Sequence, residues 1–354
     1  MLVGVMRKKL LTFFWNDIQF YIIIITLIAI AGAVFQQPAL AMLFGFAVAA
    51  FSTISNDSIQ TLGTFLSSNR KVSWQILWLF IGGIMVATIT YGWFANSGDL
   101  SFERLNQIPQ PREFTFFQLL APVVLVVLTR FSMPVSTTFL ILATFSSPGT
   151  IQGMIGKTLL GYVVAFAAAV VVWGVIAYFL KKWRKKIDDK MSKASQKRWR
   201  VLQWVSTAFL WSVWLMQDFS NAIVFLPRET TAGQLVGILV FMVIVMGFIL
   251  YRRGGEIQQV ITEKTDVINV KSATVIDFTY AIILFYFKEV NDLPMSTTWV
   301  FLGMLAGREI ALRAVTHKDK PYSHTLRLIR KDLLKAGFGL GVSLALAFFA
   351  NSQL

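Results

Sequence analysis

The sequence predicts an all-α polytopic membrane protein with two inverted-topology repeats, broken or re-entrant helices and about 11 membrane crossings. Three observations lead to this fold class: the composition, the placement of the basic residues, and an internal duplication. The 354-residue chain is 56% hydrophobic and 14% charged, with mean hydropathy +0.63, whereas a soluble domain is about a quarter charged. Apolar runs such as Trp74 to Ala95 and Leu159 to Leu180 are long enough to cross a bilayer.

Several chemistries are excluded by residues that the chain lacks. There is no cysteine, so disulfides, thiolate metal sites and cysteine nucleophiles are ruled out. The two histidines, His317 and His324, share one polar segment and do not have the spacing of a structural zinc site. The run Gly156-Lys157-Thr158 ends like a phosphate-binding loop, but Ile151 stands where its first glycine belongs. We therefore expect no enzyme activity and no cofactor beyond a coupling ion.

The basic residues predict how the chain is oriented in the membrane. The net charge is +15, and ten of the 33 Lys and Arg residues fall between Lys181 and Arg200. The others flank apolar segments instead of forming one face, which argues against nucleic-acid binding. Basic residues beside membrane spans mark the cytoplasmic side, and the 181–200 run could also contact anionic lipid headgroups.

Each apolar segment can be threaded in order from a cytoplasmic N-terminus. The segment 18–35 is longer than the apolar core of a signal peptide, so we interpret it as an uncleaved outward span. The remaining segments are 39–66 inward, 74–95 outward, 114–149 as an inward excursion and return, 157–180 inward, 204–226 outward, 232–251 inward, 273–312 as an outward excursion and return, and 333–350 outward. This path leaves five basic residues outside, namely Arg104, Arg112, Lys157, Arg228 and Lys288. We therefore expect an inner (plasma) membrane protein with a cytoplasmic N-terminus and an external C-terminus.

The same threading divides the chain into four parts. Residues 1–38 form an extra N-terminal span, and residues 39–180 form the first repeat. Residues 181–203 are a basic cytoplasmic loop, and residues 204–354 form the second repeat.

An internal duplication supports this division. The pattern Pro-x-Ser-Thr-Thr occurs at 134–138 and again at 294–298. The first copy begins 77 residues after Asp57, and the second begins 76 residues after Asp218. Each Asp comes directly after an amide residue, and a second amide residue follows three positions after the Asp. An odd number of crossings per repeat makes the two copies inverted, which is characteristic of secondary transporters with a site at the membrane midplane.

The repeated aspartates are the strongest candidates for function. A carboxylate at membrane depth costs at least about 2 kcal/mol, so it usually faces a functional cavity. With the amide oxygens nearby it forms a hard-oxygen set suited to Na⁺, and a carboxylate alone could instead carry a proton. The alternative is that the carboxylates serve only as helix-packing hydrogen-bond acceptors. The residues concerned are Asp57 and Asp218 as cation ligands, with the amides Asn56, Gln60, Gln217 and Asn221.

The two Ser-Thr-Thr elements are candidates for binding an anion. Proline followed by hydroxyl residues is typical of a helix start. A helix that begins inside the membrane directs free N–H groups and the positive end of its dipole into the site. The alternative is that the hydroxyls only satisfy backbone groups freed by a kink. The residues are Ser136, Thr137, Thr138, Ser296, Thr297 and Thr298.

Together these four motifs resemble the inorganic phosphate transporter (PiT) family. Residues 55–64 keep the Asn-Asp and Gly-Thr of its signature, and residues 216–223 keep Asp and Asn-Ala, while Gln60 and Gln217 each replace an Asn. The resemblance implies a symporter that couples Na⁺ or H⁺ to a small inorganic oxyanion, phosphate first and sulfate as the alternative. It also implies that Asp57 and Asp218 hold coupling cations and that the amide, Ser and Thr side chains named above bind the substrate.

Two further interpretations stay open from the sequence. The substituted signatures and the basic 181–200 run would also fit a non-transporting interaction or sensory protein that keeps the fold. The spacings Gly303-x-x-x-Gly307 and Gly337-x-x-x-Gly341 favour close helix packing, and could equally form the face of a homodimer.

Overall fold

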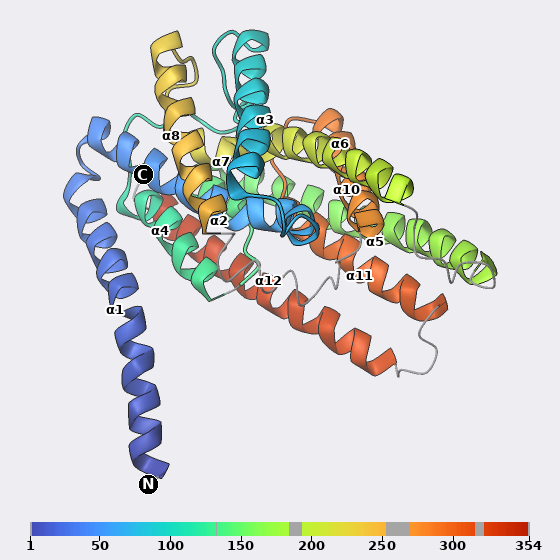
Figure 1. The fold of residues 1–354 in the computed structure, drawn as a ribbon. Helices are drawn as coiled ribbons and strands as arrows, with labels where there is room; N and C mark the ends of the chain where they lie inside the picture. The colour runs from blue at the N-terminus through green and yellow to red at the C-terminus, as the bar shows by residue number, and fades with distance from the viewer. Residues whose placement is uncertain (1, 132, 184–192, 253–269, 316–321, 353–354) are drawn as a thin grey trace.

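The computed structural model describes residues 2–131, 133–183, 193–252, 270–315 and 322–352, and the regular elements in these ranges are helices (Figure 1). An isolated antiparallel bridge joins Asp99 to Glu229. The elements are α1 (Leu2–Val34), α2 (Pro38–Ser68), α3 (Trp74–Ala95), α4 (Phe116–Arg130), the π-helical η1 (Thr138–Leu142), the 3-10 helical η2 (Ala143–Phe145), α5 (Pro148–Trp183), α6 (Lys193–Asp218), α7 (Ser220–Ile223), α8 (Ala232–Tyr251), α10 (Val270–Val290), α11 (Thr297–Val315) and α12 (Tyr322–Asn351).

Six of the described helical segments are long and apolar enough to cross a membrane. Helices suit this environment because they satisfy their own backbone hydrogen bonds. The predicted class, a polytopic all-α membrane protein, is confirmed. The six segments are Pro38–Asp57, Trp74–Ala95, Pro148–Ile176, Ala232–Tyr251, Val270–Val290 and Thr325–Asn351.

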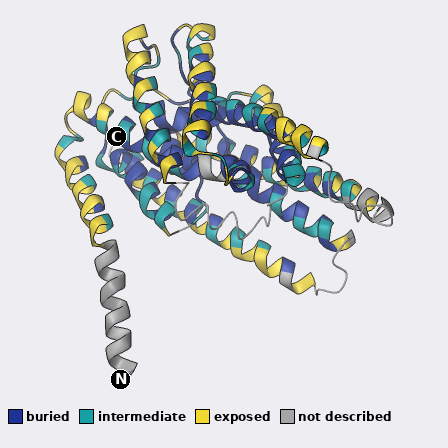
Figure 2. Ribbon diagram, viewed as in Figure 1, coloured by how far each residue is buried: buried dark blue, intermediate teal, exposed yellow. Residues whose placement is uncertain are grey.

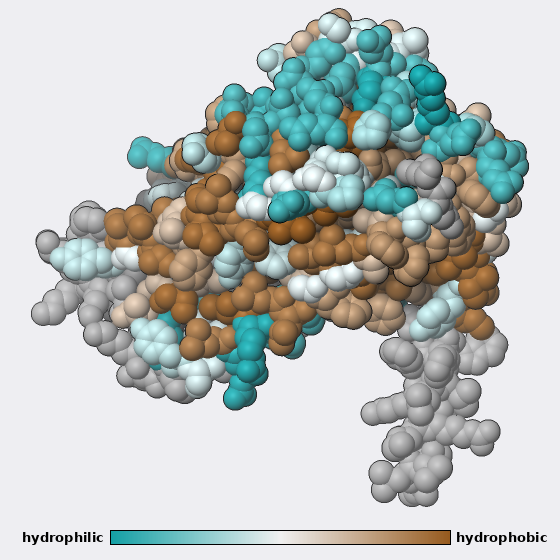
Figure 3. Space-filling view, turned by 180° about the vertical axis from the view of Figure 1, so that it is seen from behind, coloured by the Kyte–Doolittle hydropathy of each residue, from teal (hydrophilic) through white to brown (hydrophobic). Residues whose placement is uncertain are grey.

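The outer surface of the bundle is apolar, as contact with lipid requires. Leu79 is 67% exposed and Phe348 is 69% exposed, values that would be costly in water but not in a bilayer. Figure 3 shows apolar residues running across the molecule beneath a hydrophilic cap. Figure 2 shows the buried residues gathered in the middle of the bundle, with exposed residues on the outer faces of α3, α8 and α12. The polar interior described below is therefore enclosed by helices.

Helix interruptions occur where the sequence places its motifs. The chain leaves helical geometry between Arg130 and Thr138, and again between Val290 and Thr297. Each gap contains the proline of a Pro-x-Ser-Thr-Thr element. The helices break here because a proline disfavours helical geometry in the residue before it. The prediction that both motifs begin a helix is confirmed.

The two excursions of the chain differ in length. In the first, α4 has 15 residues, and η1 and η2 have five and three. In the second, α10 has 21 residues and α11 has 19. A 15-residue helix is about 22 Å long, less than the roughly 30 Å of a hydrocarbon core. We therefore interpret the first excursion, predicted over 114–149, as re-entrant.

Helices from the two halves of the sequence pack in corresponding pairs. Helix α5 lies along α11, and α12 lies along η1 and η2, so each half supplies a long helix to the motif of the other. Within the halves, α2 packs on α4 and α6 packs on α10. Helices α3 and α8 pack on each other, as Figure 1 shows near the top of the view.

Glycines make the α5–α11 contact close. A Cβ atom at Gly303 would lie 2.4 Å from the carbonyl oxygen of Tyr162, and one at Gly307 would lie 2.2 Å from that of Phe166. The Gly303-x-x-x-Gly307 spacing therefore allows two helices of the same chain to pack closely. A Cβ atom at Gly337 or Gly341 would meet nothing within 4 Å.

The predicted basic loop is partly helical. Helix α5 continues to Trp183 and α6 begins at Lys193, so both ends of the segment 181–203 belong to long helices, while 184–192 lie outside the described residues. Lys and Arg are good helix formers, which explains why the helices continue beyond the apolar part of the sequence.

Candidate functional site

The predicted site residues from both halves of the chain lie in the buried interior. Each one whose side chain is described is at most 4% exposed. The side chain of Gln60 lies outside the described residues. The buried residues are Asn56, Asp57, Ser136, Thr137, Thr138, Gln217, Asp218, Asn221, Ser296, Thr297 and Thr298.

Asp57, on α2, is tied to the first motif. The Asn56 amide donates to Asp57 Oδ1 at 2.7 Å and to the carbonyl oxygen of Val135 at 2.9 Å. The Thr137 hydroxyl donates to Asp57 Oδ2. Two successive residues of α2, Asn56 and Asp57, thus hold two residues of the first motif, Val135 and Thr137.

Asp218, at the end of α6, is tied to the same motif. The Thr138 hydroxyl donates to Asp218 Oδ1 at 3.0 Å, and the Asn221 amide donates to the same oxygen at 3.1 Å. Asn221 also donates to Thr137 Oγ1 at 2.9 Å. Neighbouring threonines therefore bind the two carboxylates, one each. We call Asn56, Asp57, Thr137, Thr138, Asp218 and Asn221 the carboxylate–threonine centre.

The two motifs contact each other reciprocally. Thr138 Oγ1 also lies 3.3 Å from the carbonyl oxygen of Met295, a second acceptor within reach of its one hydrogen, and the Thr298 hydroxyl donates to the carbonyl oxygen of Val135 at 3.2 Å. In each case the last residue of one motif reaches the second residue of the other. Thr297 lies against Asp218, so the second motif also borders the centre.

Three predicted ligands have other partners in this structure. Ser136 Oγ accepts from the backbone N–H of Phe139 at 3.2 Å, and Ser296 Oγ accepts from that of Trp299 at 3.3 Å. Both serines therefore cap the helices that follow them. The Gln217 amide donates to the carbonyl oxygen of Leu284 on α10 at 2.9 Å, so this side chain connects two helices.

The centre has more acceptors than donors. Asp218 Oδ2 and Asn221 Oδ1 are buried and accept no hydrogen bond of normal geometry from the described residues. A buried oxygen without a donor is costly. Carboxylate and amide oxygens of this kind are ligands for a hard cation or, in the case of the carboxylate, for a proton. The arrangement can therefore bind a small cation, with Thr hydroxyls adjacent to it.

A third buried carboxylate was missed by sequence reasoning. Asp277 on α10 is 0% exposed and accepts hydrogen bonds from Thr64 on α2 and Thr207 on α6. It thereby joins the helices that carry Asp57 and Asp218. The signal was present, because Asp277 stands inside an apolar run, but it has no counterpart in the other half of the sequence.

Comparisons with known proteins identify a shared fold. No protein-family profile matches this chain, and no curated protein matches it. One solved structure, "The sodium-dependent phosphate transporter", superposes with a TM-score of 0.55 at 14% sequence identity, covering 93% of this chain and 100% of that chain. The chain therefore has the fold of that structure over nearly its whole length.

Proposed function

We propose that this protein is a secondary active transporter that couples Na⁺ or H⁺ to the movement of a small inorganic oxyanion, with phosphate as the first substrate to test. The observation that carries this proposal is the pair of neighbouring threonines that link Asp57 to Asp218 between two reciprocally arranged motifs. The structural neighbour is named for sodium and phosphate, which supports the same pair of solutes here.

Cation binding would prepare the centre for an anion. A Thr hydroxyl has one hydrogen to donate, and in this structure Thr137 and Thr138 use theirs on the two carboxylates. A cation bound by these carboxylates would take the place of the hydroxyl donors. Each freed hydroxyl could then turn to an oxyanion, which the bare carboxylates would otherwise repel. The order of binding follows: cation first, anion second.

Coupling is also required by the membrane potential. An inside-negative potential opposes the inward movement of an anion by about 2.3 kcal/mol per charge per 100 mV. Two carboxylates in the centre provide places for two cations, which is enough to carry a monovalent oxyanion inward with net positive charge. The reciprocal motif contacts would be the ones that open and close as access alternates between the two sides.

The test is uptake of labelled phosphate into proteoliposomes, with and without an inward gradient of Na⁺ or H⁺. Uptake driven by one gradient, and not suppressed by excess unlabelled sulfate, would support the proposal and identify the coupling ion. Suppression by sulfate would retain the mechanism and change the substrate. Folded protein that moves neither anion would overturn the proposal in favour of a non-transporting membrane protein.

A further inference from the structure

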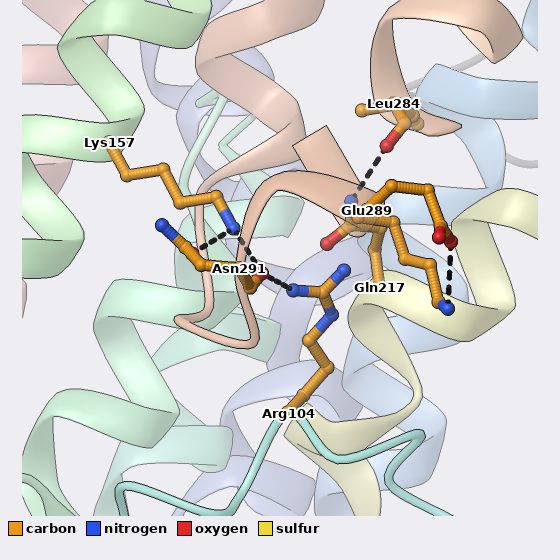
Figure 4. Close-up of polar contacts among 7 residues, drawn as sticks. Arg104, Lys157, Gln217, Leu284, Glu289 and Asn291 are labelled. Carbon is orange, nitrogen blue, oxygen red and sulfur yellow. Dashed lines mark hydrogen bonds and ion pairs between the residues drawn. The ribbon is translucent and has the colours of Figure 1, made fainter. Parts of the chain in front are cut away.

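Two buried cations meet at one backbone segment outside the carboxylate–threonine centre. Arg104 comes from the segment 96–115 between α3 and α4, and Lys157 comes from α5. Figure 4 shows both side chains pointing toward Asn291, in the gap between α10 and α11. Arg104 is 1% exposed and Lys157 is 7% exposed, so neither charge is solvated in the usual way.

Lys157 uses all three of its hydrogens on this segment, whereas Arg104 does not use all of its donors. Arg104 Nη1 donates to the carbonyl oxygen of Asn291 at 2.6 Å, and Lys157 Nζ donates to that same oxygen at 2.9 Å. Lys157 also reaches Asn291 Oδ1 and the carbonyl oxygen of Leu293, each at 2.7 Å. Arg104 Nε and Nη2 are buried and donate to nothing in the described part of the chain.

Among the described residues, no carboxylate pairs directly with either cation. The nearby residues Lys288 and Glu289 pair with each other instead, at 2.9 Å. Two positive charges therefore share one carbonyl oxygen without a described counter-ion in contact, an arrangement that a bound anion would relieve. The two unused nitrogens of Arg104 belong to a guanidinium, whose planar fork suits the paired oxygens of an oxyanion.

Arg104 keeps its charge at neutral pH. Burial lowers the pKa of Arg104 to about 10, a shift opposed by the negative charges of Asp292, Asp218, Glu289 and Glu103. Asp218 belongs to the carboxylate–threonine centre, so the guanidinium is within electrostatic reach of that centre. None of these carboxylates forms an ion pair with Arg104, and Nε and Nη2 keep their hydrogens unpaired among the described residues.

The backbone holds Arg104 in place. The two residues before it, Phe102 and Glu103, have φ of 50° and 68°, a left-handed conformation that costs a non-glycine residue about 1–2 kcal/mol. The Phe102 ring packs against Gly92 on α3, where a Cβ atom would lie 2.3 Å from it. Such strain persists only where the surroundings fix it, and it is common at binding sites.

The cation pair is continuous with the second motif. Asn291 and Leu293 lead directly into Pro294, and the backbone N–H of Ser296 donates to Thr158 Oγ1 at 3.0 Å, one residue after Lys157. The distribution of basic residues predicts that Arg104 and Lys157 lie on the outer side of the membrane. We therefore expect them to lie between that side and the carboxylate–threonine centre.

We propose that Arg104 and Lys157 form an oxyanion-binding site on the outer side, from which the anion passes to the carboxylate–threonine centre. This inference rests on the proposed function. It assigns the free N–H groups of Arg104 to the anion, and it predicts that the two cations determine the apparent affinity for an anion presented from outside. The cation-binding step at Asp57 and Asp218 is separate.

The test is the half-saturating phosphate concentration for uptake, measured for wild type, Arg104→Gln and Lys157→Gln. For Arg104→Gln, loss of charge-assisted hydrogen bonds worth about 1.5–3 kcal/mol predicts an increase of about 10- to 100-fold in that concentration, with the maximal rate changed by less than about twofold. Lys157→Gln removes a neighbouring positive charge and should raise the same concentration in the same direction. The matched control is Arg112→Gln, which removes an exposed charge on the same predicted side and should leave both values unchanged.

Other outcomes separate this inference from the proposed function. A lower maximal rate at an unchanged half-saturating concentration in Arg104→Gln would overturn the inference, because the two cations would then serve only to hold the backbone of residues 291–293.

If Arg104→Gln does not fold, Arg104→Lys is the second variant. It keeps the positive charge but loses the planar guanidinium, and it should still raise the half-saturating concentration. Binding of labelled phosphate to lipid-free protein in detergent separates free oxyanion from a lipid headgroup, and wild-type binding equal to that of both variants would also overturn it. Wild type without uptake would refute the proposed function instead.

Discussion

At the scale of single residues, the centre depends on side chains with only one hydrogen to donate. Thr137 and Thr138 each bind one carboxylate, and Asn221 binds both Thr137 and Asp218. Removing one member therefore leaves a buried partner without its hydrogen bond. Small chemical changes here should have effects much larger than those of the same changes on the lipid-facing surface.

Replacing either carboxylate should abolish coupling. Asp57→Asn and Asp218→Asn each remove one negative charge while keeping the size of the side chain, so the centre binds one cation fewer. We expect gradient-driven uptake to fall at least about tenfold, within the range of coupling free energies of 1–3 kcal/mol. The measurement is ion-driven uptake in proteoliposomes, with Glu309→Gln as a control for loss of a carboxylate elsewhere. Normal uptake in both variants would refute a coupling role.

The threonines and the serines of one motif should respond differently. Thr137→Val keeps the shape but removes a donor to Asp57 and an acceptor for Asn221, so phosphate affinity should fall by about 10-fold or more. Ser136→Ala removes a helix cap and should lower stability by about 1 kcal/mol. Thermal unfolding and phosphate titration of the two variants distinguish the roles. Equal loss of affinity in both would contradict the assignment of Ser136 as a cap.

At the scale of elements, the close packing of α5 on α11 depends on two glycines. Gly307→Ala would place a methyl group 2.2 Å from the carbonyl oxygen of Phe166, and we expect a loss of about 1–3 kcal/mol in stability from overpacking. Gly337→Ala is the matched control, because nothing lies within 4 Å of its Cβ position. Thermal unfolding in detergent measures both. Similar melting temperatures for Gly307→Ala and wild type would show that the helices can separate without cost.

The sequence was informative about elements and less so about individual contacts. Apolar length and proline position predicted the helices and their interruptions, and the duplication predicted that both aspartates and both motifs meet. The partners of Gln217, Ser136 and Ser296 depend on local rotamers and helix starts, which the repeat pattern does not encode. The position of Arg104 depends on left-handed backbone at Phe102 and Glu103, which no common sequence signal marks in non-glycine residues.

At the scale of the whole molecule, the orientation in the membrane follows from charge alone, and it can be tested directly. The chain has no cysteine, so a single introduced thiol is the only one present. Lys71→Cys and Arg112→Cys replace residues on opposite predicted sides. In intact cells, a membrane-impermeant maleimide should label Arg112→Cys at once and Lys71→Cys only after permeabilisation. The reverse pattern would invert the predicted topology.

The reciprocal contact between the motifs has a consequence for the origin of the fold. Thr138 reaches Met295 as Thr298 reaches Val135, which is how two copies of one subunit meet in an isologous dimer. The two halves are predicted to be inverted, and a two-fold axis in the plane of the membrane would relate them only if they insert in opposite orientations. We therefore expect the ancestor to be a half-length protein of dual orientation, whose fusion fixed each half in one direction. Asp277, which accepts a hydrogen bond from a threonine of each half, has no counterpart in the first half and is where the two predicted copies differ.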